Sequence, residues 1–380
     1  MQWKKYITQL GQGLLVPVLL LAGMSSAQAV VNCKMADSTS NTVPLSGHFY
    51  VGNDMPVGSV IYRTTITKTR QAGIDCDAPF SVDAEFRVVN ERSGAPFSQS
   101  GIPYSGQIYP TNVPGIGVAL WNAGRTFTSS APLTLPAYYI KDSAGPSYKF
   151  GDEFDISLIK TGNISSGVTV NGDSFPIIAQ NAVAKSGYSG LPIYYLWTVN
   201  FSGSITLDTS TCITPGNPTY DLGTFRPEDF PSVGATTAWK DVSIYLTNCP
   251  VFRGFYNNLD PAQVAIDSNS PTGGTLTNNM LEMTISPSTA NAGDQQTFML
   301  SDVADKASGM GYQIAHNPKE GMAPDEGGNN LYTSGDVLTQ SISLERSGNV
   351  SIPLRARYKR TGDLRPGKMN GSFTVTINYK

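Results

Sequence analysis

The sequence predicts an all-β protein built from many short strands, and three observations predict this fold class. The chain has 38 Gly and 25 Pro among 380 residues, and only 14% of its residues are charged. These proportions are typical of strands joined by tight turns. No long stretch combines apolar residues at the helical period with helix caps, so we expect little helix. Apolar side chains alternate strictly with polar ones over the last dozen residues, which is the period of a strand with one buried face. The apolar set is Met369, Gly371, Phe373, Val375, Ile377 and Tyr379.

The first 29 residues have the pattern of a secretory signal peptide. Lys4 and Lys5 precede an apolar run over residues 14–22, and Ala27-Gln28-Ala29 forms a small-x-small cleavage site. The alternative is a membrane anchor, but the run is short and contains Pro17. We therefore expect an exported chain that begins at Val30. The formal net charge of −3 provides no basic surface for nucleic acid.

The length predicts two domains, at residues 30–202 and 203–380. The Ser-Gly step at residues 201–205 is the expected linker. Strands are expected at 59–68, 82–89, 154–159, 164–170 and 192–200 in the first domain. In the second they are expected at 205–212, 242–248, 281–285, 311–315, 337–344, 351–358 and the C-terminus. Residues 257–278 and 317–330 are polar, Gly-rich and expected to be loops. About seven strands in the second domain fit an immunoglobulin-like sandwich.

Four cysteines, in an exported chain, predict two disulfides. Three pairings are possible. Proximity in the sequence favours Cys33 with Cys76 and Cys212 with Cys249, one bridge in each half. The alternative, a metal site, is disfavoured because no C-x-x-C occurs and the chain has only two histidines.

Several segments of the second half resemble, in order, the pilin domain of chaperone–usher fimbriae. They are Cys212, Tyr220-Asp-Leu-Gly223, Ile244-Tyr-Leu-Thr-Asn-Cys249, Ala307-Ser-Gly-Met-Gly-Tyr-Gln-Ile314, Leu354-Arg-Ala-Arg-Tyr358, Gly367 and Tyr379. The resemblance implies a sandwich that lacks its last strand. It also implies that a periplasmic chaperone, and later an adjacent fimbrial subunit, fills the resulting groove with a strand of its own.

The terminal strand would then border this groove and form the interface with the donated strand and the chaperone. The residues expected there are Met369, Phe373, Val375, Ile377, Tyr379 and Lys380, and in the family basic chaperone residues hold the terminal carboxylate. The alternative is an ordinary last strand of a complete sandwich. An outer-membrane usher is the further partner that the resemblance implies.

The first half resembles the receptor-binding domain of type 3 fimbrial (MrkD-like) adhesins. The matching segments are Pro56-Val-Gly-Ser-Val60, Pro114-Gly-Ile-Gly-Val118 and Leu158-Ile-Lys-Thr-Gly162. Only Val30, Val31 and Asn32 precede Cys33 in the mature chain, so we expect no arm to donate and a place at the fimbrial tip. The resemblance implies a tip adhesin, on the cell surface, that attaches bacteria to a host glycan or to a matrix protein such as collagen. The alternative is a minor adaptor subunit of the tip without its own receptor.

The sequence contains no catalytic motif, so we expect neither an enzyme nor a cofactor. It lacks a G-x-S-x-G elbow, an H-E-x-x-H segment and a Walker loop. Asp152, Glu153 and Asp155 cluster near a turn and could form a glycosidase pair or bind calcium. A solvated turn is the preferred interpretation, and we expect no metal.

The expected receptor surface contains Trp121, Asn122 and Arg125. Trp and Arg are enriched at binding hot spots, and these residues flank a turn in the distal domain. The alternative, which the residue type favours, is that Trp121 belongs to the core.

Overall fold

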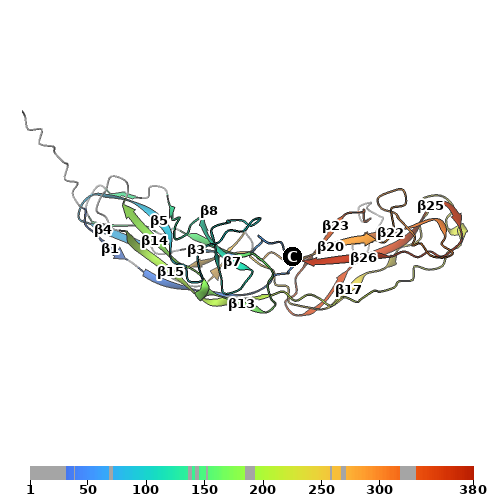
Figure 1. Cartoon of the computed structure of the whole chain (residues 1–380), viewed down its shortest axis with the longest axis horizontal. Coiled ribbons are helices and arrows are strands. Elements are labelled where there is room, and N and C mark those ends of the chain that lie inside the picture. The colour runs from blue at the N-terminus through green and yellow to red at the C-terminus, as the bar shows by residue number, and fades with distance from the viewer. Residues whose placement is uncertain are drawn as a thin grey trace, which may run out of the picture.

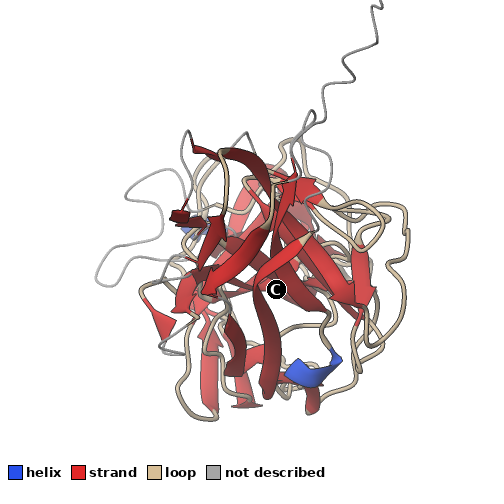
Figure 2. Ribbon diagram, turned by 90° about the vertical axis from the view of Figure 1, so that its left-hand side faces the viewer, coloured by secondary structure: helices blue, strands red, loops and turns tan. Residues whose placement is uncertain are grey.

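The computed structural model describes residues 31–37, 39–67, 72–135, 139–141, 145–150, 153–184, 193–256, 259–266, 271–316 and 331–380. The predicted signal peptide lies outside these residues. The described chain forms two β domains placed end to end, with the C-terminus where they meet (Figure 1). The predicted all-β class is confirmed, because the helical segments of the described chain are two short 3-10 turns, η1 (Gly172–Ser174) and η2 (Pro227–Asp229) (Figure 2). In the described part of the chain, no helix is long and apolar enough to cross a membrane.

The first domain is a sandwich of two large sheets with a small third sheet at its far end. One large sheet has the order β10-β5-β14-β15-β13, with β2 added to β15 and β9 to β5. The other has the order β19-β18-β3-β12-β7-β6, with β8 added to β7. The small sheet has the order β1-β4-β11.

The bounds of these strands follow in chain order. They are β1 (Cys33–Asp37), β2 (Thr39–Tyr50), β3 (Val60–Thr67), β4 (Ala72–Cys76), β5 (Phe80–Asn90), β6 (Ile108–Pro110), β7 (Ile116–Asn122), β8 (Arg125–Thr126), β9 (Leu133–Thr134), β10 (Tyr139–Lys141), β11 (Gly145–Phe150), β12 (Phe154–Lys160), β13 (Val168–Asn171), β14 (Ile177–Ala184), β15 (Tyr194–Asp208), β18 (Ala262–Ala265) and β19 (Pro271–Thr272).

Aromatic side chains from both large sheets meet between them. Phe86 on β5 stacks on Phe127 with ring centroids 5.4 Å apart, and Trp197 on β15 stacks on Phe154 of β12 at 6.1 Å. The indole nitrogen of Trp197 donates a 2.6 Å hydrogen bond to Oε1 of Gln180, so the buried polar atom is paired. Burial of such rings is the main favourable term for a sandwich of this kind.

The expected linker at residues 201–205 is part of a strand. β15 runs unbroken through residues 201–205, and Ile205 and Leu207 are fully buried in the first core. Gly203 has φ +70° because β2 passes beside it: a Cβ there would lie 2.2 Å from the carbonyl oxygen of Leu45. The glycine thus permits close strand packing within one domain, and residues 205–208 belong to the first domain, whereas Cys212 is buried in the second core.

The second half of the chain also contributes two strands to the first domain. β18 pairs in parallel with β3, from Ala262 opposite Thr64 to Ala265 opposite Thr67, and β19 pairs with β18. Val264 and Ile266 are buried in the first core. Part of the predicted loop at residues 257–278 is therefore sheet structure.

The second domain contains the remaining sheets, of four, three and two strands. Their orders are β16-β25-β22-β21, β23-β20-β26 and β17-β24. The strands are β16 (Lys240–Asp241), β17 (Ile244–Cys249), β20 (Asn279–Pro287), β21 (Phe298–Met299), β22 (Ser308–His316), β23 (Val337–Ile342), β24 (Gly348–Ile352), β25 (Leu354–Arg365) and β26 (Phe373–Tyr379).

Each half holds one disulfide. Cys33 is bonded to Cys76 on the neighbouring strand, and Cys212 to Cys249 at the end of β17. These are the pairings that spacing along the chain favoured. Both bridges close loops of about forty residues, which restricts the unfolded chain.

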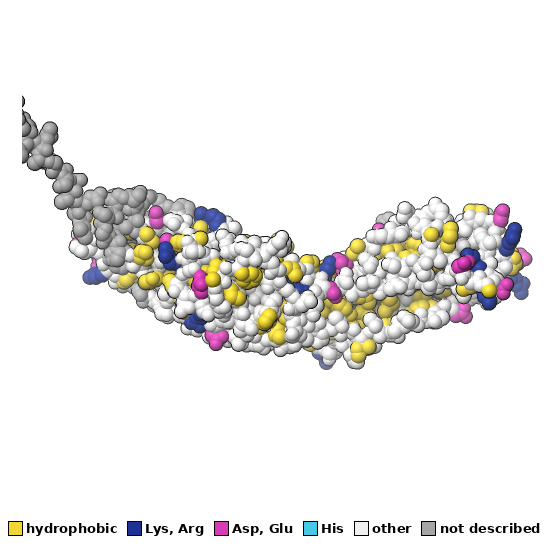
Figure 3. Space-filling view, viewed as in Figure 1, with side chains coloured by type: hydrophobic (Ala, Val, Ile, Leu, Met, Phe, Trp, Pro, Cys, Tyr) yellow, Lys and Arg dark blue, Asp and Glu magenta, His cyan; other side chains and the backbone are white. Residues whose placement is uncertain are grey.

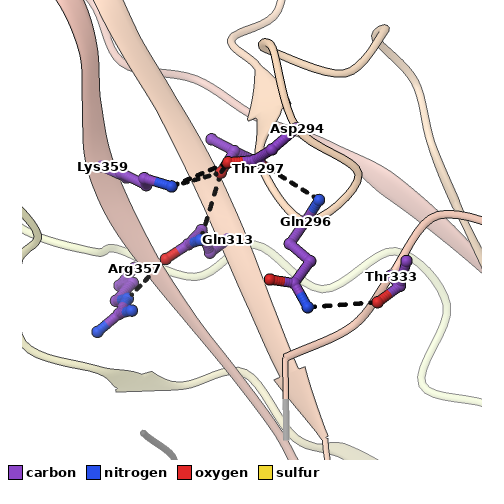
Figure 4. A network of polar contacts seen from close by, with 7 residues as sticks. All are labelled: Asp294, Gln296, Thr297, Gln313, Thr333, Arg357 and Lys359. Carbon is purple, nitrogen blue, oxygen red and sulfur yellow. Dashed lines mark hydrogen bonds and ion pairs between the residues drawn. The ribbon is translucent and has the colours of Figure 1, made fainter. Parts of the chain in front are cut away.

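A polar network covers the outer face of β22 and β25 in the second domain (Figure 4). Lys359 donates a 2.9 Å hydrogen bond to Oδ2 of Asp294, and Arg357 donates one of 3.0 Å to Oε1 of Gln313. Gln313 in turn donates to Thr297. This face is closed by paired polar groups, in contrast to the edge described next.

Candidate functional site

The C-terminal strand β26 lies at an edge of its sheet and is only half covered. It pairs with β20 from Phe373 opposite Pro287 to Tyr379 opposite Leu281, and no other described strand pairs with it. Its burial alternates as the sequence predicts, with Thr374 and Thr376 exposed. The strand is shorter than expected, because it begins at Phe373 and leaves Met369 and Gly371 in the preceding segment.

Inward-facing side chains of β26 remain partly open to solvent. Leu281, Met283 and Ile285 of the adjacent β20 are at most 4% exposed. Phe373, Val375 and Ile377 point into the same core yet are only partly buried. Figure 3 shows the result as a band of hydrophobic atoms along the second domain, beside β26.

Several apolar side chains of the second domain cover its core without being buried themselves. All are partly buried and pack against its core: Leu222, Phe225, Met369, Phe373, Val375 and Ile377. A soluble protein rarely leaves an apolar strip next to an unpaired strand edge, because such an edge promotes aggregation. The arrangement therefore offers both a hydrophobic groove and unpaired main-chain groups to another strand.

The end of β26 is held by the first domain. Tyr379 is 4% exposed, and its ring lies 6.3 Å from that of Tyr50 and 6.1 Å from that of Phe252. Its N–H donates a 3.2 Å hydrogen bond to Oδ2 of Asp54. Lys380 forms an ion pair with Glu282, N–O distance 2.5 Å, and lowers the pKa of that carboxyl. The C-terminus is thus part of the joint between the domains.

Lys160 organises the first-domain side of this joint. Its side chain is 1% exposed, and its ammonium donates hydrogen bonds to the carbonyls of Gly52 (2.9 Å), Asn53 (2.6 Å) and Met55 (2.7 Å). Burial lowers the pKa of Lys160. The three contacts fix the loop at residues 51–55, which carries Asp54. A lysine at the end of a strand of buried residues, β12, was the sequence signal for this role.

The three segments that resemble MrkD-like adhesins meet around this loop. The N–H of Gly58 donates to the carbonyl of Lys160, and the N–H of Lys160 to that of Ser59. Gly115 has φ +87° and accepts from the N–H of Thr161. A cavity of about 570 Å³ lies at the joint itself, lined by residues of both domains that include Met55, Phe255 and Met280. These segments thus build the domain joint.

The residues expected at the receptor surface occupy one hairpin but differ in burial. Trp121 is 8% exposed, its indole N–H donates a 3.0 Å hydrogen bond to Oγ of Ser157, and Tyr104 stacks on it. Asn122 is half-buried and donates to the carbonyl of Glu153. Arg125 is exposed beyond the turn. The hairpin therefore offers Arg125 fully and Asn122 partly to a ligand. Trp121 lies in a small hydrophobic cluster that is separate from the main core of the first domain.

A polar cluster that sequence reasoning missed adjoins Trp121 on the same outer face of the sheet. The guanidinium of Arg63 lies 4.3 Å from the ring centroid of Trp121 and donates a 3.0 Å hydrogen bond from Nε to Asp155. Thr65 donates to the same carboxylate oxygen at 2.6 Å. Asp155 is therefore buried and paired, which corrects the prediction that it lies in a solvated turn.

The acidic residues considered for hydrolysis do not form a pair in the described part of the chain. Of the three acidic residues considered for hydrolysis, Asp152 lies outside the described residues, Glu153 is exposed and Asp155 is committed to Arg63. Within the described ranges, no group of three His, Cys, Asp or Glu side chains is placed to hold a metal ion.

Comparison with known proteins connects these features to families. The fimbrial protein family matches residues 199–380, and the MrkD-like receptor-binding domain matches residues 45–181. A fimbria adhesin protein of Klebsiella pneumoniae is 25% identical over 228 residues, which cover 57% of this chain and 60% of that protein. The S-fimbrial adhesin protein SfaS of Escherichia coli O6:K15:H31 is 22% identical over 169 residues, covering 44% of this chain and 77% of that protein.

Among solved structures, the CupB6 tip adhesin of Pseudomonas aeruginosa aligns over 91% of this chain and 94% of its own, with 13% identity and a TM-score of 0.34. The two family matches divide the chain in the same order as its two sandwiches, receptor-binding first and fimbrial second. The chain is therefore a fimbrial adhesin that joins a MrkD-like receptor-binding domain to a fimbrial-protein domain.

Proposed function

We propose that this chain is the receptor-binding subunit at the tip of a chaperone–usher fimbria and that its second domain is completed by a strand from another protein. The observation that carries the proposal is β26: its inward side chains are partly open, and within the described chain its outer edge has no strand partner. An incoming strand would pair with that edge and fill the groove with alternate side chains. The periplasmic chaperone donates the strand first and the adjacent subunit later, and the usher mediates the exchange.

The groove can be tested with a synthetic peptide of alternating Val and Thr, longer than β26. Binding should raise the melting temperature of the mature chain, because a ligand at a hundredfold excess over its Kd stabilises the folded state by about 2.7 kcal/mol. Val375 and Ile377 amides should become protected from hydrogen exchange. A peptide with Asp at every Val position is the matched control for strand length.

Two variants of the chain distinguish the groove from nonspecific binding. Ile377→Asp places a charge on the inward face and should abolish peptide binding. Thr376→Asp places the same charge on the exposed face and should bind nearly as well as the wild type. Equal binding by both variants, or none by the wild type, would contradict strand acceptance.

We further propose that the first domain attaches the bacterium to a host glycan or a matrix protein such as collagen, without catalysis. The support is the MrkD-like match, together with the exposed hairpin that carries Asn122 and Arg125. The binding assay uses the whole mature chain, because β15 and β18 tie the first domain to later sequence. Saturable binding in a panel of collagens, other matrix proteins and glycans, competed by the soluble ligand, is expected. Absence of binding across the panel would favour an adaptor subunit.

A further inference from the structure

The hydrogen-bond register of β26 shows which of its main-chain groups are available to a partner. Lys380 and Met280 exchange both of their N–H···O bonds, at 2.6 and 2.8 Å. In an antiparallel ladder such pairs alternate, so every second residue directs its N–H and C=O away from the neighbouring strand. The main-chain N–H and C=O groups of Phe373, Val375, Ile377 and Tyr379 therefore point to the outer edge of the sheet, while their side chains point into the core.

The last of these outward positions is already occupied by the first domain. The N–H of Tyr379 donates to the Asp54 carboxylate at 3.2 Å. Gly52 lies so close that a Cβ on it would be 1.9 Å from the carbonyl oxygen of Tyr379. The N–H and the C=O of Tyr379 are thus covered by one loop, and that loop is anchored by Lys160.

A second anchor keeps the loop in this place. The ring of Tyr50 lies 4.5 Å from that of Phe252, inside the second core. Its carbonyl accepts a 3.3 Å hydrogen bond from Nδ2 of Asn279, whose Oδ1 accepts from Gly254 N–H at 3.0 Å. The loop is therefore a fixed boundary at the end of β26.

We propose that residues 51–55 of the receptor-binding domain are the end stop of the acceptor edge and set the register of the donated strand. The donated strand pairs with the main chain of Phe373, Val375 and Ile377 and ends before Tyr379. The inference rests on the proposed strand acceptance. It assigns Asp54 and Gly52 as positioning residues for a partner that binds the other domain.

The first test measures amide exchange at Tyr379 by NMR in the free mature chain. Asp54→Ala should speed this exchange about tenfold, because the amide loses its acceptor. Asp54→Asn keeps an acceptor oxygen and should retain most of the protection. Glu282→Gln, which alters another carboxylate at the same strand end, should have no effect on the Tyr379 amide. Unchanged exchange in Asp54→Ala, with a normal melting temperature, would overturn the inference.

The second test adds the alternating Val–Thr peptide to Asp54→Ala. With the Asp54 acceptor removed, the N–H of Tyr379 is free to pair with the peptide, which should restore slow exchange at that amide. Protection of Val375 and Ile377 without protection of Tyr379 would show that Asp54 is not the group that ends the pairing. If the peptide protects no β26 amide even in the wild type, strand acceptance itself fails, so the two failures are distinguishable.

Discussion

Replacement of Lys160 by Met should destabilise the first domain by about 3 kcal/mol. The ammonium donates to three carbonyls, of which those of Gly52 and Met55 belong to buried residues. Each buried acceptor left unpaired costs about 1–3 kcal/mol, whereas the third acceptor, on exposed Asn53, can turn to water. Part of this loss of stability is offset, because burial of the Lys160 ammonium away from water is itself unfavourable and Met carries no charge.

Urea unfolding of the mature chain, followed by tryptophan fluorescence, measures this change. For a domain of this size, 3 kcal/mol corresponds to a fall in melting temperature of about 6–12 °C. Lys34→Met is the matched control, because that side chain is 78% exposed and its ion pair with Asp75 should contribute less than about 1 kcal/mol. A Lys160→Met chain within about 0.5 kcal/mol of the wild type would refute the structural role given to this residue.

Four further predictions follow from particular contacts. Trp121→Ala should lower the stability of the first domain by about 3–5 kcal/mol; a normal melt with lost receptor binding would instead make Trp121 a ligand residue. Tyr379→Ser should reduce co-purification with the periplasmic chaperone, since it removes an inward ring, and unchanged recovery would count against this. Cys212→Ser should destabilise the second domain alone, by about 4 kcal/mol; calorimetry showing an equal loss in both domains would contradict it. The Ser243 hydroxyl and N–H hold the pKa of Asp241 below 3.8. The ionised Asp241 carboxylate therefore stabilises the folded state above pH 3.8, and this stabilisation is lost as the pH falls further. Asp241→Asn should make the free energy of unfolding depend less on pH in that acid range.

Local pattern was enough to predict the features that depend on neighbouring residues in the sequence. The alternation along β26 and the pairing of each disulfide within its half are of this kind, and both are seen in the structure. The strand period follows from side chains two residues apart. The terminal strand and the disulfides could thus be placed before any fold was known, whereas the groove was only implied by the pilin resemblance.

Features that depend on distant segments could not be predicted in this way. β18 is a strand of only four residues whose partner, β3, lies about two hundred residues earlier in the chain. The Ser-Gly step at Gly203 has the composition of a linker, but the close approach of Leu45 determines its role. The burial of Trp121 depends on the outer-face cluster with Ile102, and composition gives no sign of which face such a cluster covers.

The exchange of elements between the two halves constrains how receptor specificity can be recombined. Tyr50 belongs to the first half but packs in the second core, and β18 belongs to the second half but completes the first sheet. A gene fusion that replaces only the first two hundred codons would leave β18 facing a foreign sheet edge and Phe252 without the ring of Tyr50. A functional chimera must therefore carry residues 259–272 together with the receptor-binding half.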